Sequence, residues 1–300
     1  MDITLNGIFP AMITPFTSTG GVDLPAFKSN IKRWNQYGLH GYLAIGSTGE
    51  APFLSSGERA KLIRAARQTM AEGMVLLAGT GKESTAQTIK ACREAADMGA
   101  DAALVLTPAF FTPLMTAPAL ERHYRAVADA SPIPILLYAM PAFTGVTIPL
   151  QTVTALAQHP NIAGMKDSSG NGQYLSTIIR NTPADFAVFT GNAPTFAQAL
   201  MSQASGAILA IANLIPEICV ALYRASAAHN FTEVQHLHNL LQPISEVVGG
   251  AYGIGGLKHA MTLLGYKAGL PRPPLLPPTK AQIQEITVAL QKAGLLESPR

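Results

Sequence analysis

The sequence has 300 residues, of which 48% are hydrophobic and 13% are charged, whereas about 25% of the residues in an average soluble domain are charged. A chain with so many apolar residues is able to fill a large core, and this excludes intrinsic disorder. Lysine and arginine number 21 against 18 acidic residues, for a formal net charge of +3. Because these charges are scattered, they predict no nucleic-acid partner.

Neither a secretory signal nor a membrane helix is predicted. The N-terminus carries an early acidic residue, Asp2, and lacks the basic segment and apolar run of a signal peptide. Residues 102–120 are uncharged and long enough to cross a bilayer, but Pro108, Pro113 and Pro118 remove backbone donors that lipid is unable to replace. We therefore expect a buried strand that runs into a proline-rich loop, in a cytoplasmic protein without a membrane partner.

Eight short apolar runs recur along the first part of the chain. Each is almost continuously apolar, which is typical of parallel strands that are buried on both faces. We expect strands at Gly7–Ile13, Gly41–Ile45, Met74–Ala78, Ala102–Leu106, Ile133–Tyr138, Asn161–Met165, Phe186–Phe189 and Gly206–Ala210.

Segments with helical character lie between these strands. Asp23 is a suitable N-cap for the first of them, and Gly99 is a suitable C-cap for the third. The predicted helices are Leu24–Tyr37, Ser56–Glu72, Ser84–Gly99, Ala119–Ala130 and Leu150–Gln158.

The repeated strand–helix unit predicts an α/β fold, namely a closed (β/α)8 TIM barrel over residues 1–215. Residues 216–300 contain at least three more helical segments, and we expect them to pack on the barrel as a C-terminal helical appendage. Within it, Pro271–Thr279 is a stiff connector before the amphipathic helix Gln282–Lys292. A doubly wound open sheet is the alternative, but it usually has a glycine-rich phosphate turn after its first strand, where this chain has Ile13–Phe16.

Catalytic residues of such barrels lie at the carboxyl ends of the strands. Of the ten lysines, only Lys166 ends an apolar strand. Burial disfavours the charged form of an ammonium group, and the neutral amine is able to attack a ketone to form a Schiff base. The alternative is a structural lysine paired with Asp167.

Two further features support the catalytic interpretation. Tyr138 ends the strand before that of Lys166, and neighbouring parallel strands lie about 4.8 Å apart, so its phenol is placed to move protons. The turn Gly46–Glu50 follows the second strand and combines two glycines with two hydroxyl groups. Exposed backbone N–H groups in such a turn suit a carboxylate, and a keto acid carries one.

No metal or cofactor is predicted. Cys92 and Cys219 are far apart and form no C-x-x-C motif. His236 and His238 are two residues apart in a predicted helix and therefore point to different faces. The segment Gly253–Gly256 lacks the third glycine of a dinucleotide site because Lys258 occupies that position, and we interpret the segment as a place of close helix packing.

Together these residues resemble the dihydrodipicolinate synthase and N-acetylneuraminate lyase family of pyruvate-dependent class I aldolases. The resemblance covers nearly the whole chain. It implies that Lys166 forms the Schiff base, that Tyr138 shuttles protons and that the Ile208 carbonyl lines the lysine pocket. It also implies a homotetramer built as a dimer of dimers. In the second motif, the resemblance implies that Ser47, Thr48 and Gly49 hold the pyruvate carboxylate. The motifs that carry the resemblance are Gly7-x-x-x-Ala11-x-x-Thr14-Pro15-Phe16, Gly46-Ser47-Thr48-Gly49-Glu50, Tyr138-Ala139-Met140-Pro141 and Gly164-Met165-Lys166-Asp167-Ser168-Ser169.

The sequence departs from the family pattern on the side that would bind the second substrate. Phe143 occupies the position where the synthases have an arginine that binds a carboxylate. Phe110 lies in the segment that supplies, in the synthases, a second tyrosine from a neighbouring subunit. Gly191 is followed by Asn192 instead of the acidic pair of the neuraminate lyases. We therefore expect an intact site for pyruvate or another 2-keto acid beside an acceptor site that is more apolar because of Phe110 and Phe143.

The leading hypothesis is a Schiff-base lyase that interconverts a 2-keto acid with pyruvate and an aldehyde. Three alternatives remain open. The same imine is able to support dehydration of a 2-keto-3-deoxy sugar acid. Genuine 4-hydroxy-tetrahydrodipicolinate synthesis is disfavoured by Phe143 and Phe110. A barrel that binds keto acids without turnover is the alternative outside enzymes.

Overall fold

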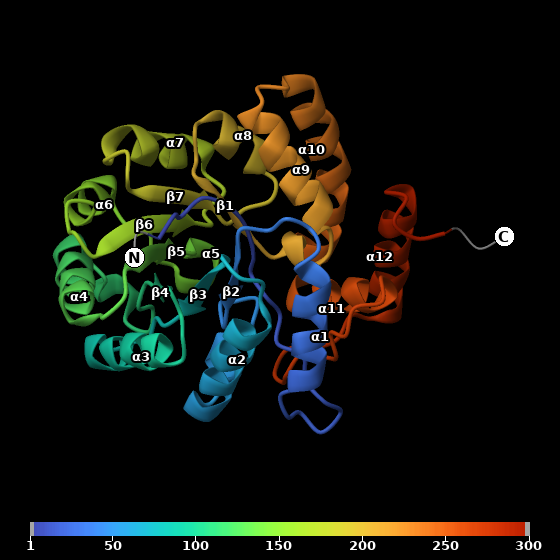
Figure 1. Cartoon of the computed structure of the whole chain (residues 1–300), viewed down its shortest axis with the longest axis horizontal. Coiled ribbons are helices and arrows are strands. Elements are labelled where there is room, and N and C mark those ends of the chain that lie inside the picture. Colours follow the sequence, from blue (N-terminus) through green and yellow to red (C-terminus); the bar gives the residue numbers. More distant parts are fainter. Residues whose placement is uncertain (1–2, 298–300) are drawn as a thin grey trace.

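The computed structural model describes residues 3–297 and shows eight parallel strands that form a barrel surrounded by helices (Figure 1). The strands pair in chain order from β2 to β8, and β8 pairs with β1. A single parallel bridge between Ala11 and Leu43 joins β1 to β2. The predicted TIM barrel is therefore confirmed. Its strands are β1 Gly7–Pro10, β2 Gly41–Ala44, β3 Val75–Gly79, β4 Ala102–Leu106, β5 Ile135–Ala139, β6 Ile162–Asp167, β7 Ala187–Thr190 and β8 Gly206–Leu209.

The helices between the strands begin where the sequence offers caps. The Asp23 side chain accepts the backbone N–H of Ala26 at the start of the first helix, and Ser55 and Glu58 form a capping box at the start of the second. These helices are α1 Leu24–Trp34, α2 Ser56–Thr69, α3 Thr85–Asp97, α4 Ala117–Ala130, α5 Pro141–Thr144, α6 Leu150–Leu156, α7 Gly172–Asn181 and α8 Phe196–Met201.

Side chains from several strands fill the inside of the barrel. Phe9 on β1 meets Phe189 on β7 edge to face, with ring centroids 5.5 Å apart. Leu77, Leu104 and Leu136 belong to the same buried cluster. This packed interior leaves space for a ligand only at the ends of the barrel.

The C-terminal part of the chain is helical, as predicted, and shares a hydrophobic core with the barrel. Leu257 and Ile286 belong to the same buried cluster as Phe16 and Trp34 of the N-terminal part. How the chain divides into folding units near residue 215 stays a prediction. The helices are α9 Pro216–Ala227, α10 Phe231–Ser245, α11 Gly253–Leu263 and α12 Lys280–Lys292, with a π-helical segment, η4 Glu246–Ala251, before α11.

Two glycines of α11 allow the close packing that the sequence predicted. A Cβ atom on Gly255 would lie 2.5 Å from the carbonyl oxygen of Leu276, and one on Gly256 would lie 2.6 Å from the Cβ atom of Tyr252. The connector after α11 therefore lies directly against this helix.

The uncharged stretch 102–120 is strand β4 followed by a loop and the start of α4. Within residues 3–297, the structure has no helix whose length and apolar character would allow it to cross a membrane.

Candidate active site

A cavity of about 700 Å³ opens at the carboxyl ends of the strands, a volume in the usual range for small-molecule sites. Most of the residues that the sequence singled out line this cavity. They are Ser47, Thr48, Tyr138, Phe143, Lys166, Gly191, Asn192 and Ile208.

Lys166 and Tyr138 face each other from neighbouring strands. They occupy paired positions in the parallel ladder of β5 and β6. Both are 4% exposed, and the Lys166 Nζ atom lies 4.3 Å from the centroid of the Tyr138 ring. The barrel register thus brings an amine and a phenol together in a site that is shielded from water.

The surroundings of Tyr138 lower its pKa. Burial by itself raises the pKa of this group, but the Lys166 ammonium and the neighbouring Ser47, Ser168 and Lys166 side chains outweigh it, so that the pKa lies below the ordinary value of 10. The Ser47 Oγ atom is 3.4 Å from the Tyr138 hydroxyl oxygen. A phenolate beside an ammonium group is able to take its proton and leave a neutral amine.

Asp167 is not the ion-pair partner of Lys166. Its carboxylate accepts hydrogen bonds from the Ser169 hydroxyl at 2.7 Å and from the Ser169 backbone N–H at 3.3 Å. Burial nevertheless raises the pKa of Asp167. In the described part of the chain, no carboxylate forms a salt bridge with Lys166. A structural lysine is expected to form such a salt bridge, so the structure does not support that interpretation.

Gly191 and Ser168 define the space around the lysine side chain. A Cβ atom on Gly191 would lie 2.5 Å from Lys166 Cε and 2.0 Å from Ser168 Oγ. The Ser168 hydroxyl is buried and has no hydrogen-bond partner among the described residues. The residue after β7 must therefore be glycine if Lys166 is to keep this position, and Ser168 offers an unused hydroxyl to a ligand.

The turn Gly46–Glu50 presents backbone donors next to Tyr138. Within residues 3–297, the backbone N–H groups of Ser47 and Thr48 have no acceptor, and both residues line the cavity. Gly49 lies outside the lining, and its carbonyl accepts the Thr14 hydroxyl at 2.6 Å. Gly49 thus fixes the turn, while Ser47 and Thr48 provide the donors that a carboxylate needs.

A buried ion pair with the C-terminal segment holds the end of this turn. Glu50 has a left-handed backbone (φ 57°), and its carboxylate lies 2.5 Å from the Lys258 Nζ atom. Both side chains are almost completely buried. Glu50 also accepts the backbone N–H of Arg272 at 2.7 Å, and Lys258 donates to the Leu270 carbonyl at 3.0 Å. The N-terminal turn and the C-terminal segment are therefore fastened together.

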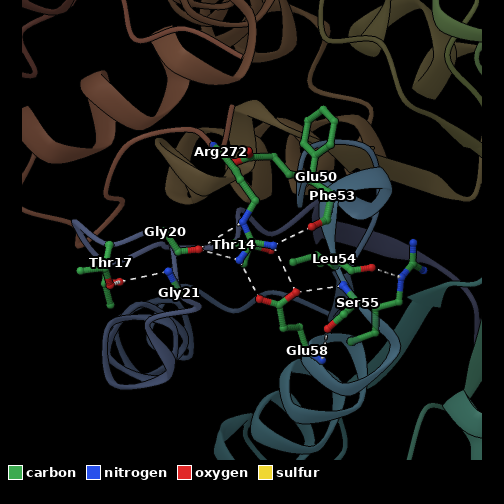
Figure 2. A network of polar contacts seen from close by, with 12 residues as sticks. Thr14, Thr17, Gly20, Gly21, Glu50, Phe53, Leu54, Ser55, Glu58 and Arg272 are labelled. Atoms are coloured by element: carbon green, nitrogen blue, oxygen red, sulfur yellow. Dashed lines mark hydrogen bonds and ion pairs between the residues drawn. The ribbon is translucent and has the colours of Figure 1, made fainter. Parts of the chain in front are cut away.

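Arg272 extends this network around the turn, as Figure 2 shows. Its guanidinium donates to both Glu58 carboxylate oxygens, at 2.6 and 3.1 Å, and to the carbonyl groups of Gly20 and Phe53. It also stacks on the Phe16 ring. The Arg272 hydrogen bonds lower the pKa of Glu58 to about 2. The bidentate pair thus remains charged in neutral solution.

We expect Lys258→Met to lower the free energy of unfolding by about 3–5 kcal/mol, because it leaves the Glu50 carboxylate buried without its cation. Urea denaturation followed by circular dichroism measures this loss. The matched control is Lys90→Met, since Lys90 forms an exposed pair with Glu94 at 3.8 Å and such pairs contribute about 0.5 kcal/mol or less.

A second variant separates the effect of the unpaired Glu50 charge from the effect of the lost Lys258 side chain. Adding Glu50→Gln to Lys258→Met removes the uncompensated carboxylate, and part of the stability should return. A loss below about 1 kcal/mol in Lys258→Met would contradict the importance of this ion pair.

Phe110 lies outside the cavity of its own chain, and its expected place at the acceptor site stays a prediction. It is 79% exposed and does not line the cavity. The Glu83 carboxylate binds the backbone N–H groups of Ala109 and Phe110, and the Phe110 ring packs on Phe111. These contacts direct the loop after β4 outwards.

Part of the cavity wall was missed by the sequence analysis. It comes from η4, α11 and the connector after α11, and includes Val248, Tyr252, Ile254 and Leu276. Val248, Ile254 and Leu276 carry no catalytic side-chain type, and no motif in the sequence marks Tyr252, so only the fold places these residues at the site.

No cluster of three or more His, Cys, Asp or Glu residues suited to a metal occurs in the described range 3–297. The donors at the cavity are an amine, a phenol, hydroxyl groups and backbone N–H groups. Such a set suits acid–base and imine chemistry of a carbonyl substrate.

Comparisons with known proteins agree with this geometry. The model of the dihydrodipicolinate synthetase family matches residues 4–293. The 4-hydroxy-tetrahydrodipicolinate synthase of Rhodospirillum centenum is 35% identical over 291 residues, which cover 97% of this chain and 99% of that protein. The same enzyme from Exiguobacterium sibiricum is 34% identical over 275 residues, which cover 92% and 93%.

Solved structures of similar proteins have the same fold. The dihydrodipicolinate synthase of Aquifex aeolicus superposes with a TM-score of 0.92 at 30% identity, covering 98% of this chain and all of that one. The chloride-inhibited dihydrodipicolinate synthase of Acinetobacter baumannii, solved in complex with pyruvate, superposes with a TM-score of 0.93 at 29% identity and the same coverage.

Proposed function

This chain belongs to the dihydrodipicolinate synthetase family of pyruvate-dependent aldolase-type lyases, and from that premise we propose that it interconverts a 2-keto acid with pyruvate and an aldehyde through a Schiff base on Lys166. The observation that carries the proposal is the buried contact of Lys166 with Tyr138. The nearby turn with Ser47 and Thr48 supports it.

The first step joins the keto acid to the enzyme. Tyr138 takes a proton from the Lys166 ammonium, and the free amine attacks the ketone carbon to form a carbinolamine. Tyr138 returns its proton to the carbinolamine hydroxyl, so that water leaves, an iminium ion forms and Tyr138 is again a phenolate. The backbone N–H groups of Ser47 and Thr48 hold the substrate carboxylate, which orients the ketone towards the amine.

The second step breaks the carbon–carbon bond. A base, the Tyr138 phenolate, accepts the proton of the substrate hydroxyl group, and the aldehyde leaves as the bonding electron pair moves into the iminium ion. The resulting enamine gains a proton at carbon, and hydrolysis then releases pyruvate and the Lys166 amine. The condensation runs through the same steps in reverse.

Reductive trapping tests the proposal directly. Borohydride added with pyruvate should reduce the imine and attach a carboxyethyl group to the peptide that contains Lys166, as detected by mass spectrometry. An unmodified Lys166 under saturating pyruvate would contradict the proposed function. Exchange of the pyruvate methyl protons into deuterium oxide, followed by NMR, distinguishes an enzyme from a barrel that only binds keto acids.

Product analysis separates cleavage from dehydration. A lyase releases free pyruvate from a hydroxylated keto acid, whereas a dehydratase releases water and keeps the carbon chain whole. We expect free pyruvate, which lactate dehydrogenase and NADH detect continuously.

We expect Gly191→Ala to slow pyruvate trapping by about 100-fold or more, because the added methyl group displaces Lys166 Cε and a shift of about 1 Å in a reacting group has effects of this size. The trapping rate at fixed pyruvate concentration measures it. Gly57→Ala is the matched control, since a Cβ atom there meets nothing within 4 Å. Equal trapping rates in the two variants would show that Gly191 does not set the position of the lysine.

We also propose that the chain assembles into a homotetramer. Phe110, Phe111 and Leu114, in the segment between β4 and α4, are each more than 60% exposed. Large neighbouring apolar side chains on a surface are typical of an interface. Sedimentation velocity should give a tetramer that Phe111→Asp dissociates; a monomer for the unmodified protein at micromolar concentration would contradict this proposal.

A further inference from the structure

The half of the cavity beyond Lys166 has mainly apolar walls. On this observation, and resting on the function proposed above, we propose that the acceptor substrate is an uncharged aldehyde with an alkyl or aryl body. The walls come from the loops after β5 and β7 and from the C-terminal segment, with Met140, Phe143, Ala193, Pro194, Val248, Tyr252, Ile254, Leu275 and Leu276.

The charges around this half of the cavity disfavour an anionic acceptor. The described cavity lining contains two charged side chains, Lys166 and Glu246. Lys166 is bonded to the keto acid in the proposed reaction, and Glu246 is itself negative. A second carboxylate on the aldehyde would lose water without gaining a cation, which is costly.

Hydroxyl groups on this side are engaged within the protein. The Ser245 hydroxyl donates to the Gln242 carbonyl at 3.0 Å, and the Tyr252 hydroxyl donates to Glu285 on α12. A polyhydroxylated acceptor would give up hydrogen bonds to water and find these groups already paired. These two hydroxyl groups are therefore not available to a sugar-derived aldehyde.

An apolar body matches both the size and the surface of this space. Pyruvate is much smaller than a cavity of about 700 Å³, so the acceptor has room for a ring or a branched chain. Burial of apolar surface against residues such as Leu276 and Ile254 is favourable by about 25 cal/mol per Å². These contacts would hold the aldehyde next to the enamine during condensation.

The test compares two acceptors of equal chain length that differ by one charged group, butanal and succinic semialdehyde, in pyruvate-dependent condensation by the full-length enzyme. We expect kcat/KM to be about 100-fold higher for butanal, with benzaldehyde accepted and glyceraldehyde a poor substrate. Equal or better use of succinic semialdehyde or aspartate semialdehyde would overturn the inference.

The same preparations are also treated with pyruvate and borohydride. This measurement distinguishes failure of the inference about the acceptor from failure of the proposed Schiff-base function. Trapping at Lys166 together with a preference for anionic aldehydes overturns only the inference about the acceptor. Absence of trapping overturns the proposed function.

A pair of variants at Phe143 tests the role of charge at the cavity mouth. Phe143→Arg adds a cation and should lower the butanal preference by about 10-fold or more, whereas Phe143→Leu should leave it within about 2-fold. The ratio is taken within each variant, so differences in the amount of folded protein cancel. An unchanged ratio in Phe143→Arg would contradict the electrostatic argument.

Discussion

Lys166→Met is expected to abolish turnover, with a fall in rate of about 10⁴-fold or more, because no other group forms the covalent intermediate. Methionine keeps an unbranched side chain of similar length, so the cavity should keep its shape. Pyruvate release from a hydroxylated keto acid measures the rate, and mass spectrometry after borohydride treatment should find no labelled peptide.

Lys166→Arg separates nucleophilic from electrostatic effects. Arginine keeps the positive charge beside Tyr138, but its guanidinium remains protonated and does not attack a ketone. Both variants should therefore be inactive. Turnover by Lys166→Arg within about 10-fold of the unmodified enzyme would mean that the amine acts only through its charge.

The sequence predicted that Lys166, Tyr138 and Ser47 lie together because their positions depend on strand order. The register of β5 and β6 places Tyr138 opposite Lys166, and the end of β2 brings Ser47 within 3.4 Å of the Tyr138 hydroxyl. In a parallel barrel, residues at the carboxyl ends of strands share one rim. Correct prediction of the strands was therefore sufficient to predict this cluster.

The acceptor side and the support of the turn were harder to predict because they depend on contacts between distant parts of the chain. Lys258 was interpreted only as a residue that interrupts a glycine motif, yet it binds Glu50 from the opposite end of the sequence. One signal was present: Lys258 is the only Lys, Arg, Asp or Glu residue of α11, among Leu257, Ala260 and Met261. A lone lysine in an apolar helix indicates a buried partner.

The position of the Phe110 ring is also hard to predict from the sequence. Within this chain, the Glu83 carboxylate binds the backbone of the loop that carries Phe110, and the ring is exposed outside the cavity. A hydrogen bond from a distant side chain to a loop backbone has no pattern in the local sequence. Phe143, in contrast, lies on the short helix directly after β5 and lines the cavity as expected.

Tyr138→Phe is expected to lower the rate of carbon–carbon cleavage by about 10²–10⁴-fold, the usual contribution of a proton-transfer group. The phenyl ring remains beneath Lys166, so trapping of pyruvate should persist at a reduced rate. Exchange of the pyruvate methyl protons into deuterium oxide, measured by NMR, reports the same proton transfers without an aldehyde.

The dependence of the rate on pH shows whether Tyr138 is the group that transfers the proton. Because the Lys166 ammonium and the neighbouring Ser47, Ser168 and Lys166 side chains lower the pKa of Tyr138 against the effect of burial, the phenolate should form below the ordinary value of 10. The rate of the unmodified enzyme should therefore rise with pH through a limb below pH 10, and Tyr138→Phe should lose that limb. Tyr124→Phe is the control, since the Tyr124 hydroxyl donates to the Val105 carbonyl at 3.2 Å; it should cost about 1 kcal/mol of stability and leave the limb in place. A limb that persists in Tyr138→Phe would assign the proton transfer to another group.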